Sequence, residues 1–169
     1  MKKIMIITII VSFLTGLLTS AASPDRKESR QEQYNNIVEL IENGDFIFKA
    51  RRAYPQTGSP IDLTTNPGLI EISEKTGEAR LPFFGRAYNI PYGGRGGITF
   101  SGELKNVEVS ENPDRMRVSY SFEVRDREYY QVNMNIGYNG DASVIIMSNN
   151  RAQISYHGHV SGMQDREKF

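Results

Sequence analysis

Two histidines near the end of the chain, His157 and His159, could bind a metal ion. Residues two apart in an extended strand project from the same face, so both imidazole rings could reach one transition metal. A protein metal site needs further ligands, however, and the sequence around this pair offers no evident third one. We therefore expect no cofactor, keep the two histidines as weak metal candidates, and favour the interpretation that they lie on a solvated strand face.

A second candidate site is the segment from Leu81 to Gly97, in which aromatic residues alternate with glycines and arginines. Glycines let a ligand approach the backbone, rings supply contact area, and arginines bind carboxylate, phosphate or sulfate groups through paired hydrogen bonds. The candidate ligand-binding residues of this lip are Phe83, Phe84, Arg86, Tyr88, Tyr92 and Arg95. The competing interpretation is that the rings belong to the core and the glycines to a mobile turn.

The sequence contains no recognisable catalytic arrangement. It lacks cysteine, which excludes thiolate nucleophiles, cysteine zinc sites and disulfides. It has no Gly-x-Ser-x-Gly elbow, and its glycine-rich segment lacks the Gly-Lys-Ser/Thr end of a phosphate loop. The carboxylates of Glu111, Asp114, Asp126 and Glu128 lie beside arginines at predicted turns, where solvated or paired charge is expected. We predict no catalytic residue and favour a protein that is not an enzyme.

The charge balance argues against nucleic-acid binding. The chain has 20 Lys and Arg against 20 Asp and Glu. No long-range field therefore attracts the whole protein to nucleic acid or to an anionic membrane, and we expect no nucleic-acid partner.

The first segment of the chain has the order of a secretory signal peptide. Lys2 and Lys3 precede an apolar run from Ile4 to Leu18, and small residues follow before Ser23. The run falls short of the ~20 residues that cross a hydrocarbon core. We expect residues 1–22 to be removed, which predicts a periplasmic or secreted protein with no transmembrane anchor after cleavage.

Residues 23–44 are predicted to form one amphipathic helix. Its apolar stripe consists of Tyr34, Ile37, Val38, Leu40 and Ile41. The helix could begin at Ser29, which has the capping-box spacing to Glu32, or at Ser23, and Gly44 supplies a left-handed stop. We expect the stripe to dock on a sheet.

Beyond the helix, the apolar period changes to two, which predicts strands. Alternation is cleanest between Arg115 and Arg125, and Asn139-Gly140 indicates a hairpin turn. The apolar residues from Ala142 to Met147 predict a strand covered on both faces. The predicted strands are Phe46–Tyr54, Gly68–Ser73, Glu78–Phe83, Gly97–Ser101, Glu103–Ser110, Arg115–Arg125, Tyr130–Ile136, Ala142–Met147 and Ala152–Val160.

This order of elements predicts a mainly β protein. The last five strands form an antiparallel meander, and the whole set curls into a barrel-like sheet or a sandwich with the N-terminal helix at one end or face. We rank the barrel above the sandwich. Residues 45–169 form this β domain, which together with the helix makes a single globular unit.

Several of these residues also carry a family resemblance. They are the stretch Leu81 to Tyr88, Pro91-Tyr92, Gly97 to Phe100, Ser148 to Arg151, Ile154 to Tyr156, and Gly158. With these motifs the chain resembles the domain of unknown function 4251 family of exported bacterial proteins. The resemblance implies an exported protein and supports the expected architecture, and it implies no catalytic residue.

Taken together, these patterns favour a non-catalytic binding module of the cell envelope. Its expected ligand is a small apolar or anionic molecule, a lipid or a peptide, bound at the aromatic lip. The alternative is a structural or interaction protein that pairs with another envelope protein through a sheet edge or its helix. A hydrolase or metal enzyme is less favoured, because no catalytic constellation is visible.

Overall fold

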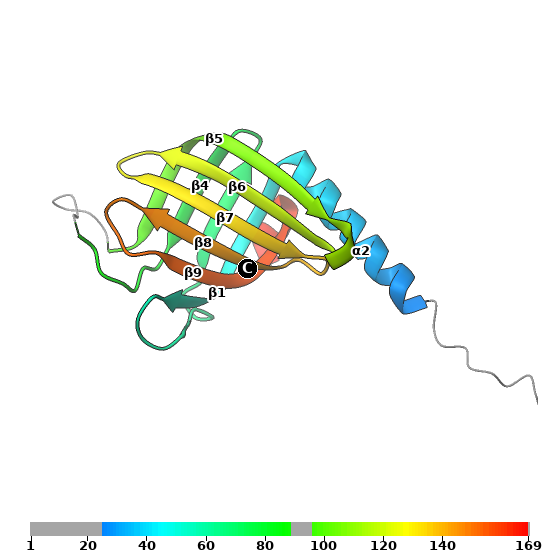
Figure 1. The fold of residues 1–169 in the computed structure, drawn as a ribbon, viewed down its shortest axis with the longest axis horizontal. Coiled ribbons are helices and arrows are strands. Elements are labelled where there is room, and N and C mark those ends of the chain that lie inside the picture. The colour runs from blue at the N-terminus through cyan, green and yellow to red at the C-terminus, as the bar shows by residue number, and fades with distance from the viewer. Residues whose placement is uncertain (1–24, 89–95, 169) are drawn as a thin grey trace, which may run out of the picture.

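The protein is described here from a computed structural model, which covers residues 25–88 and 96–168 (Figure 1). One helix is followed by strands, as predicted. The elements are α2 (Asp25–Asn43), β1 (Asp45–Pro55), β2 (Ile61–Asp62), β3 (Gly68–Ser73), β4 (Thr76–Leu81), β5 (Ile98–Asn112), the 3₁₀ turn η2 (Pro113–Arg115), β6 (Arg117–Arg125), β7 (Tyr129–Gly137), β8 (Asp141–Ser148), β9 (Ile154–Gly162) and the 3₁₀ helix η3 (Met163–Lys168).

The strands form a closed antiparallel barrel. Neighbouring strands follow the order β1-β3-β4-β5-β6-β7-β8-β9, and β1 also pairs with β9, which closes the ring. The short strand β2 pairs with β1 outside this ring. The predicted barrel-like sheet and the meander from β5 to β9 are therefore confirmed, and the sandwich is not formed.

Some strands differ from the prediction in their extent. The two strands expected at 97–101 and 103–110 are one strand, β5, because Gly102 pairs with Gly77 of β4 in unbroken register. Farther along β5, the register with β6 shifts between Lys105 and Glu108, with Asn106 at a φ of 50°. The outer face of β8 is only half-buried at Ile145 and Met147, so the expected cover on both faces is wrong.

Side chains fill the interior of the barrel. Alternate residues of each strand point inward, as the burial pattern of β6 and β7 shows. Large rings pack against one another there, with the Phe46 and Tyr120 rings 5.2 Å apart and the Phe100 and Tyr130 rings 5.5 Å apart. Tyr156 is fully buried among them. The barrel is thus a packed core.

Helix α2 closes one end of the barrel (Figure 1). Tyr34 and Ile41 from its apolar stripe are buried in the core, as predicted. The helix ends at Gly44, whose φ of 72° is the expected left-handed stop. Ser29 lies inside the helix, so the prediction of a cap there is wrong, and the alternative start at Ser23 lies outside the described residues. Within the described part, no helix is both long and apolar enough to span a bilayer.

The closure between β1 and β9 depends on Gly158. A Cβ atom at this position would lie 2.0 Å from the Lys49 carbonyl oxygen and 2.9 Å from the Ala50 Cα atom. The two backbones therefore meet more closely than any other residue would allow. Beside this contact the pairing register shifts between Ala50 and Arg52, so Arg51 forms a β-bulge.

We predict that Gly158→Ala lowers the free energy of unfolding by at least about 2 kcal/mol, because the added methyl group must push β1 and β9 apart. Urea denaturation followed by circular dichroism would measure the change. Gly96→Ala is the matched control, since a Cβ there meets no atom within 4 Å. Equal stability of the two variants would contradict the proposed role of Gly158.

Candidate functional site

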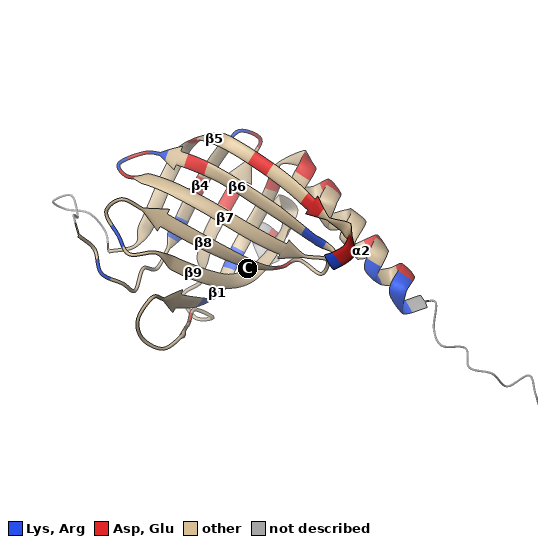
Figure 2. Ribbon diagram, in the orientation of Figure 1, with Lys and Arg blue, Asp and Glu red and all other residues tan. Residues whose placement is uncertain are grey.

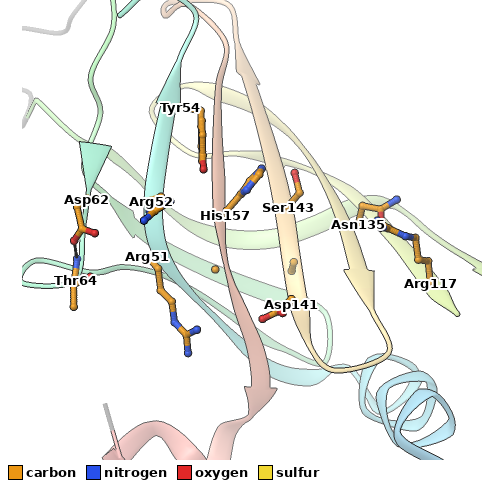
Figure 3. A pocket seen from close by; sticks show the side chains of 12 residues that line it. Arg51, Arg52, Tyr54, Asp62, Thr64, Arg117, Asn135, Asp141, Ser143 and His157 are labelled. Carbon is orange, nitrogen blue, oxygen red and sulfur yellow. Dashed lines mark hydrogen bonds between the residues drawn. The ribbon is translucent and has the colours of Figure 1, made fainter. Parts of the chain in front are cut away.

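A shallow groove of about 550 Å³ lies on the outer wall of the barrel (Figure 3). It crosses strands β1, β9, β8, β7 and β6, and the short strand β2 borders it. Its polar, charged and aromatic lining consists of Arg51, Arg52, Tyr54, Asp62, Thr64, Arg117, Asn135, Asp141, Ser143 and His157. Because these side chains converge from six strands that are distant in the sequence, the groove exists only in the closed barrel.

The bulge in β1 places two consecutive arginines on this outer wall. In a regular strand, neighbouring side chains point to opposite faces, so one of the two would point into the core. Here Ala50 and Ala53 are buried, whereas Arg51 and Arg52 between them are both exposed. The Leu63 amide donates a 2.8 Å hydrogen bond to the Arg51 carbonyl oxygen, which joins the bulge to the segment after β2.

The charges of the groove are unequally compensated. Hydrogen bonds from Thr64, one of them a 2.8 Å bond from its amide, hold the pKa of Asp62 below its ordinary value, and the nearby charge of Arg52 adds to this effect. Arg117 donates a 2.8 Å hydrogen bond to the Asn135 amide oxygen. Arg51 forms no ion pair with any described residue, and its side chain extends away from the Tyr54 and His157 rings (Figure 3). The Arg51 guanidinium is therefore available to bind an anion.

Two rings form the centre of the groove. The Tyr54 and His157 rings lie 4.4 Å apart at an angle of 41°, and Arg52 is the β1 partner of His157 in the β1–β9 ladder. The second histidine, His159, is on the same outer face, with Nδ1 3.5 Å from Asp141 Oδ1. Among the described residues, no three His, Cys, Asp or Glu side chains converge as a metal site. The histidine pair stays a weak metal candidate.

The barrel end opposite α2 is organised by a buried ion pair. Arg151 donates from Nε to Glu128 Oε2 at 3.1 Å and from Nη2 to Oε1 at 2.9 Å, and each side chain is only 4% exposed. Ser148 donates a further 3.2 Å hydrogen bond to the carboxylate. The guanidinium also reaches the Gly96 carbonyl oxygen at 3.3 Å and lies 5.3 Å from the Phe83 ring centre. The arginine thus joins three separate turns.

This pairing sets the ionisation of the groups around it. Burial alone would raise the pKa of Glu128, but the hydrogen bonds and charge of Arg151 outweigh it and hold the pKa below its ordinary value. Burial, aided by the Glu128 charge, raises the pKa of Tyr130 to about 12. Glu128 was expected to be solvated or paired at a turn, and it is paired in a buried position.

The segment with the predicted lip residues is fixed to this end of the barrel. The Tyr88 amide donates to the Asn150 carbonyl oxygen at 2.8 Å, and the Ala152 amide donates to the Arg86 carbonyl oxygen at 2.9 Å. Phe83 is half-buried against the core. Phe84, Arg86 and Tyr88 are exposed, whereas Tyr92 and Arg95 lie outside the described residues. The lip and the groove are separate surfaces, and ligand binding at the lip stays a prediction.

A model of the family described as "Domain of unknown function (DUF4251)" matches residues 28–160, which is most of the chain. The chain belongs to the DUF4251 family. The match includes both barrel ends, the groove and the buried ion pair, so the resemblance seen in the sequence motifs is confirmed.

A solved structure has the same fold. It is the crystal structure of a DUF4251 family protein from Bacteroides eggerthii DSM 20697, with 20% sequence identity and a TM-score of 0.64 over 80% of this chain and 91% of that chain. No curated protein matches the chain.

Sequence reasoning on this DUF4251 protein missed the groove and the buried ion pair. The sequence did contain a signal for the groove. Two consecutive arginines, Arg51-Arg52, break the apolar and polar alternation of the predicted strand, and such a break indicates a β-bulge. Arg151 and Glu128 gave no comparable signal, because each lies in a turn where an exposed charge is usual.

We predict that Arg151→Met destabilises the protein by about 3–5 kcal/mol, because it leaves the Glu128 carboxylate buried without a partner. The double variant Arg151→Met with Glu128→Leu should recover most of this loss, since no charge then stays buried. Denaturant titration of both variants measures the difference. A double variant as unstable as the single one would show that the cost comes from lost packing.

We also predict acid sensitivity from this pair. A carboxyl whose pKa is depressed in the folded state contributes stability above its unfolded pKa of about 4.3–4.5, and the contribution disappears as the pH falls through the lower folded value. The slope of unfolding free energy against pH below about pH 5 should therefore be shallower in Glu128→Gln than in the parent. Parallel slopes would exclude Glu128 as a source of the acid response.

Proposed function

We propose that this protein is an exported, non-catalytic binding module of the cell envelope that takes a small anionic ligand in the groove on its outer wall. The bulge in β1 carries the proposal, because it sets Arg51 and Arg52 side by side on one face. Two adjacent guanidinium groups suit a carboxylate, phosphate or sulfate group, which arginine binds through paired hydrogen bonds.

The remaining lining supports the same ligand class. The Tyr54 and His157 rings offer a flat apolar contact beside the arginines, while Asn135 and Ser143 offer hydrogen bonds to the polar groups of a ligand. The two carboxylates of the groove, Asp62 and Asp141, face three arginines, so the groove keeps a positive excess.

The packed interior favours a ligand that binds on the surface. Rings and aliphatic side chains occupy the inside of the barrel, where carriers of apolar ligands keep a cavity. Export is supported by the sequence of residues 1–22, which lie outside the described part. The proposed location is therefore the periplasm or the outside of the cell.

One observation favours the alternative, an interaction protein of the envelope. β5 continues beyond the end of β4, which pairs with it only as far as Glu103. After the buried Leu104, the remaining residues of β5 are exposed, with Val107 and Val109 at 44% and 45%. This part of the strand pairs with β6 alone, so its other edge could accept a strand from another protein.

We predict that replacing both Arg51 and Arg52 with Ala weakens anion binding at least about tenfold, because two charge-assisted contacts are lost. Isothermal titration with inorganic phosphate, citrate and glucuronate in turn would measure the affinity of the parent and the variant. At least one of these anions should bind the parent saturably.

The control is Arg115→Ala, which removes an exposed arginine from the turn η2 outside the groove. It should leave the affinity unchanged. Absence of saturable binding by all three anions, or an equal loss in the control, would refute the groove as an anion site.

A further inference from the structure

Two exposed aromatic residues lie on the segment after β4, which is hydrogen-bonded to the turn between β8 and β9 at the barrel end opposite α2. Tyr88 is 70% exposed and Phe84 is 36% exposed, and only three residues lie between them in the chain. Neither residue lines the groove of the proposed function. Large apolar side chains at the tip of a segment cost solubility unless they contact something, so this pair indicates a contact surface.

Hydrogen bonds to the rest of the barrel fix the backbone of the segment that carries the two aromatic residues. The segment after β4 is hydrogen-bonded to the turn between β8 and β9 on both sides of Ala87, which forms a bridge with Arg151. The Tyr156 hydroxyl donates a 2.7 Å hydrogen bond to the Pro82 carbonyl oxygen at the start of the segment. The rings are thus presented by a fixed backbone, which lowers the entropy lost on binding.

Exposed arginines lie on the turns of the same barrel end. Arg86 is exposed between the two rings in sequence. The ion pair of Arg151 with Glu128 brings the turn between β6 and β7 alongside, and that turn adds the exposed Arg125 and Arg127.

Acidic groups offset these cations only in part, since Glu78 lines the same shallow groove on the outer wall as Arg127. In the described parts of these turns the exposed carboxylate is Asp126, since Glu128 is buried and neutralised by Arg151. Figure 2 shows both basic and acidic stretches on the loop between β6 and β7 and along α2, whereas β5 carries acidic stretches.

We propose that this end of the barrel docks on the surface of an anionic phospholipid bilayer. Phe84 and Tyr88 enter the headgroup region, where aromatic side chains with an apolar body and a polar tip are favoured. Arg86, Arg125 and Arg127 contact lipid phosphates. The chain as a whole carries no net charge, so the attraction is local to this end and acts within the Debye length of about 10 Å.

The arrangement favours a bilayer over a folded partner. The rings and arginines lie on turns at one end of the barrel, whereas a folded protein partner needs a larger complementary face. Docking by the tip leaves the groove on the barrel wall open to solvent, so the two surfaces can act independently.

The absence of tryptophan from the chain permits a site-specific test. In Tyr88→Trp, the new indole reports its own surroundings by fluorescence. The protein is purified after export by the expression host, with its N-terminus determined by mass spectrometry. Vesicles of phosphatidylglycerol and phosphatidylcholine should shift the emission to shorter wavelength, and vesicles of phosphatidylcholine alone should shift it much less.

The matched control is Val109→Trp, at a residue that is 45% exposed at the helix end of the barrel. Its emission should not shift with either vesicle. Adding Arg86→Ala or Arg127→Ala to Tyr88→Trp should weaken binding to the anionic vesicles about fivefold for each arginine removed. An unshifted Tyr88→Trp, an equal shift in Val109→Trp, or an affinity that ignores both arginines would overturn the proposal.

Discussion

The approach of β9 to β1 at Gly158 is the constraint on which the structure depends. A backbone contact this close admits no side chain, and it converts a curled sheet into a ring without exposed edges between its first and last strands. The same contact accompanies the bulge at Arg51, which turns an otherwise inward position to the surface. One glycine is therefore linked both to the closure of the barrel and to the chemistry of its outer wall.

The two ends of the barrel are closed by different means. At one end, Tyr34 and Ile41 of α2 pack into the core, so burial of their apolar surface stabilises the contact between the helix and the barrel. At the other end, Arg151 and Glu128 are buried as a pair and satisfy each other, together with Ser148 and the Gly96 carbonyl oxygen. A buried pair adds less net stability than an apolar plug of the same size, but it fixes which turns lie together. Here it unites the turns that expose the aromatic and basic tip.

The fold was largely predictable from the sequence, because the two-residue period of β6 and β7 requires one buried and one solvated face. The extent of β5 was not predictable, since Gly102 interrupts the strand pattern of the sequence, whereas in the structure it pairs with Gly77 of β4 and the strand continues. The groove depends on Arg52 meeting His157 across the barrel closure. No local pattern specifies that pairing, so the lip, which is continuous in sequence, was the site that could be proposed.

The alternation of inward and outward side chains along most strands places two different constraints on the residues of this chain. Inward positions are constrained by a shared, densely packed volume, so each change there affects many neighbours. Outward-facing side chains do not share a packed volume, so a change at one of them affects fewer neighbours. The crystal structure from Bacteroides eggerthii has the same fold at 20% sequence identity. Substitutions on the outer wall of such a barrel can therefore change the shape and charge of its surface while the packed interior keeps the architecture.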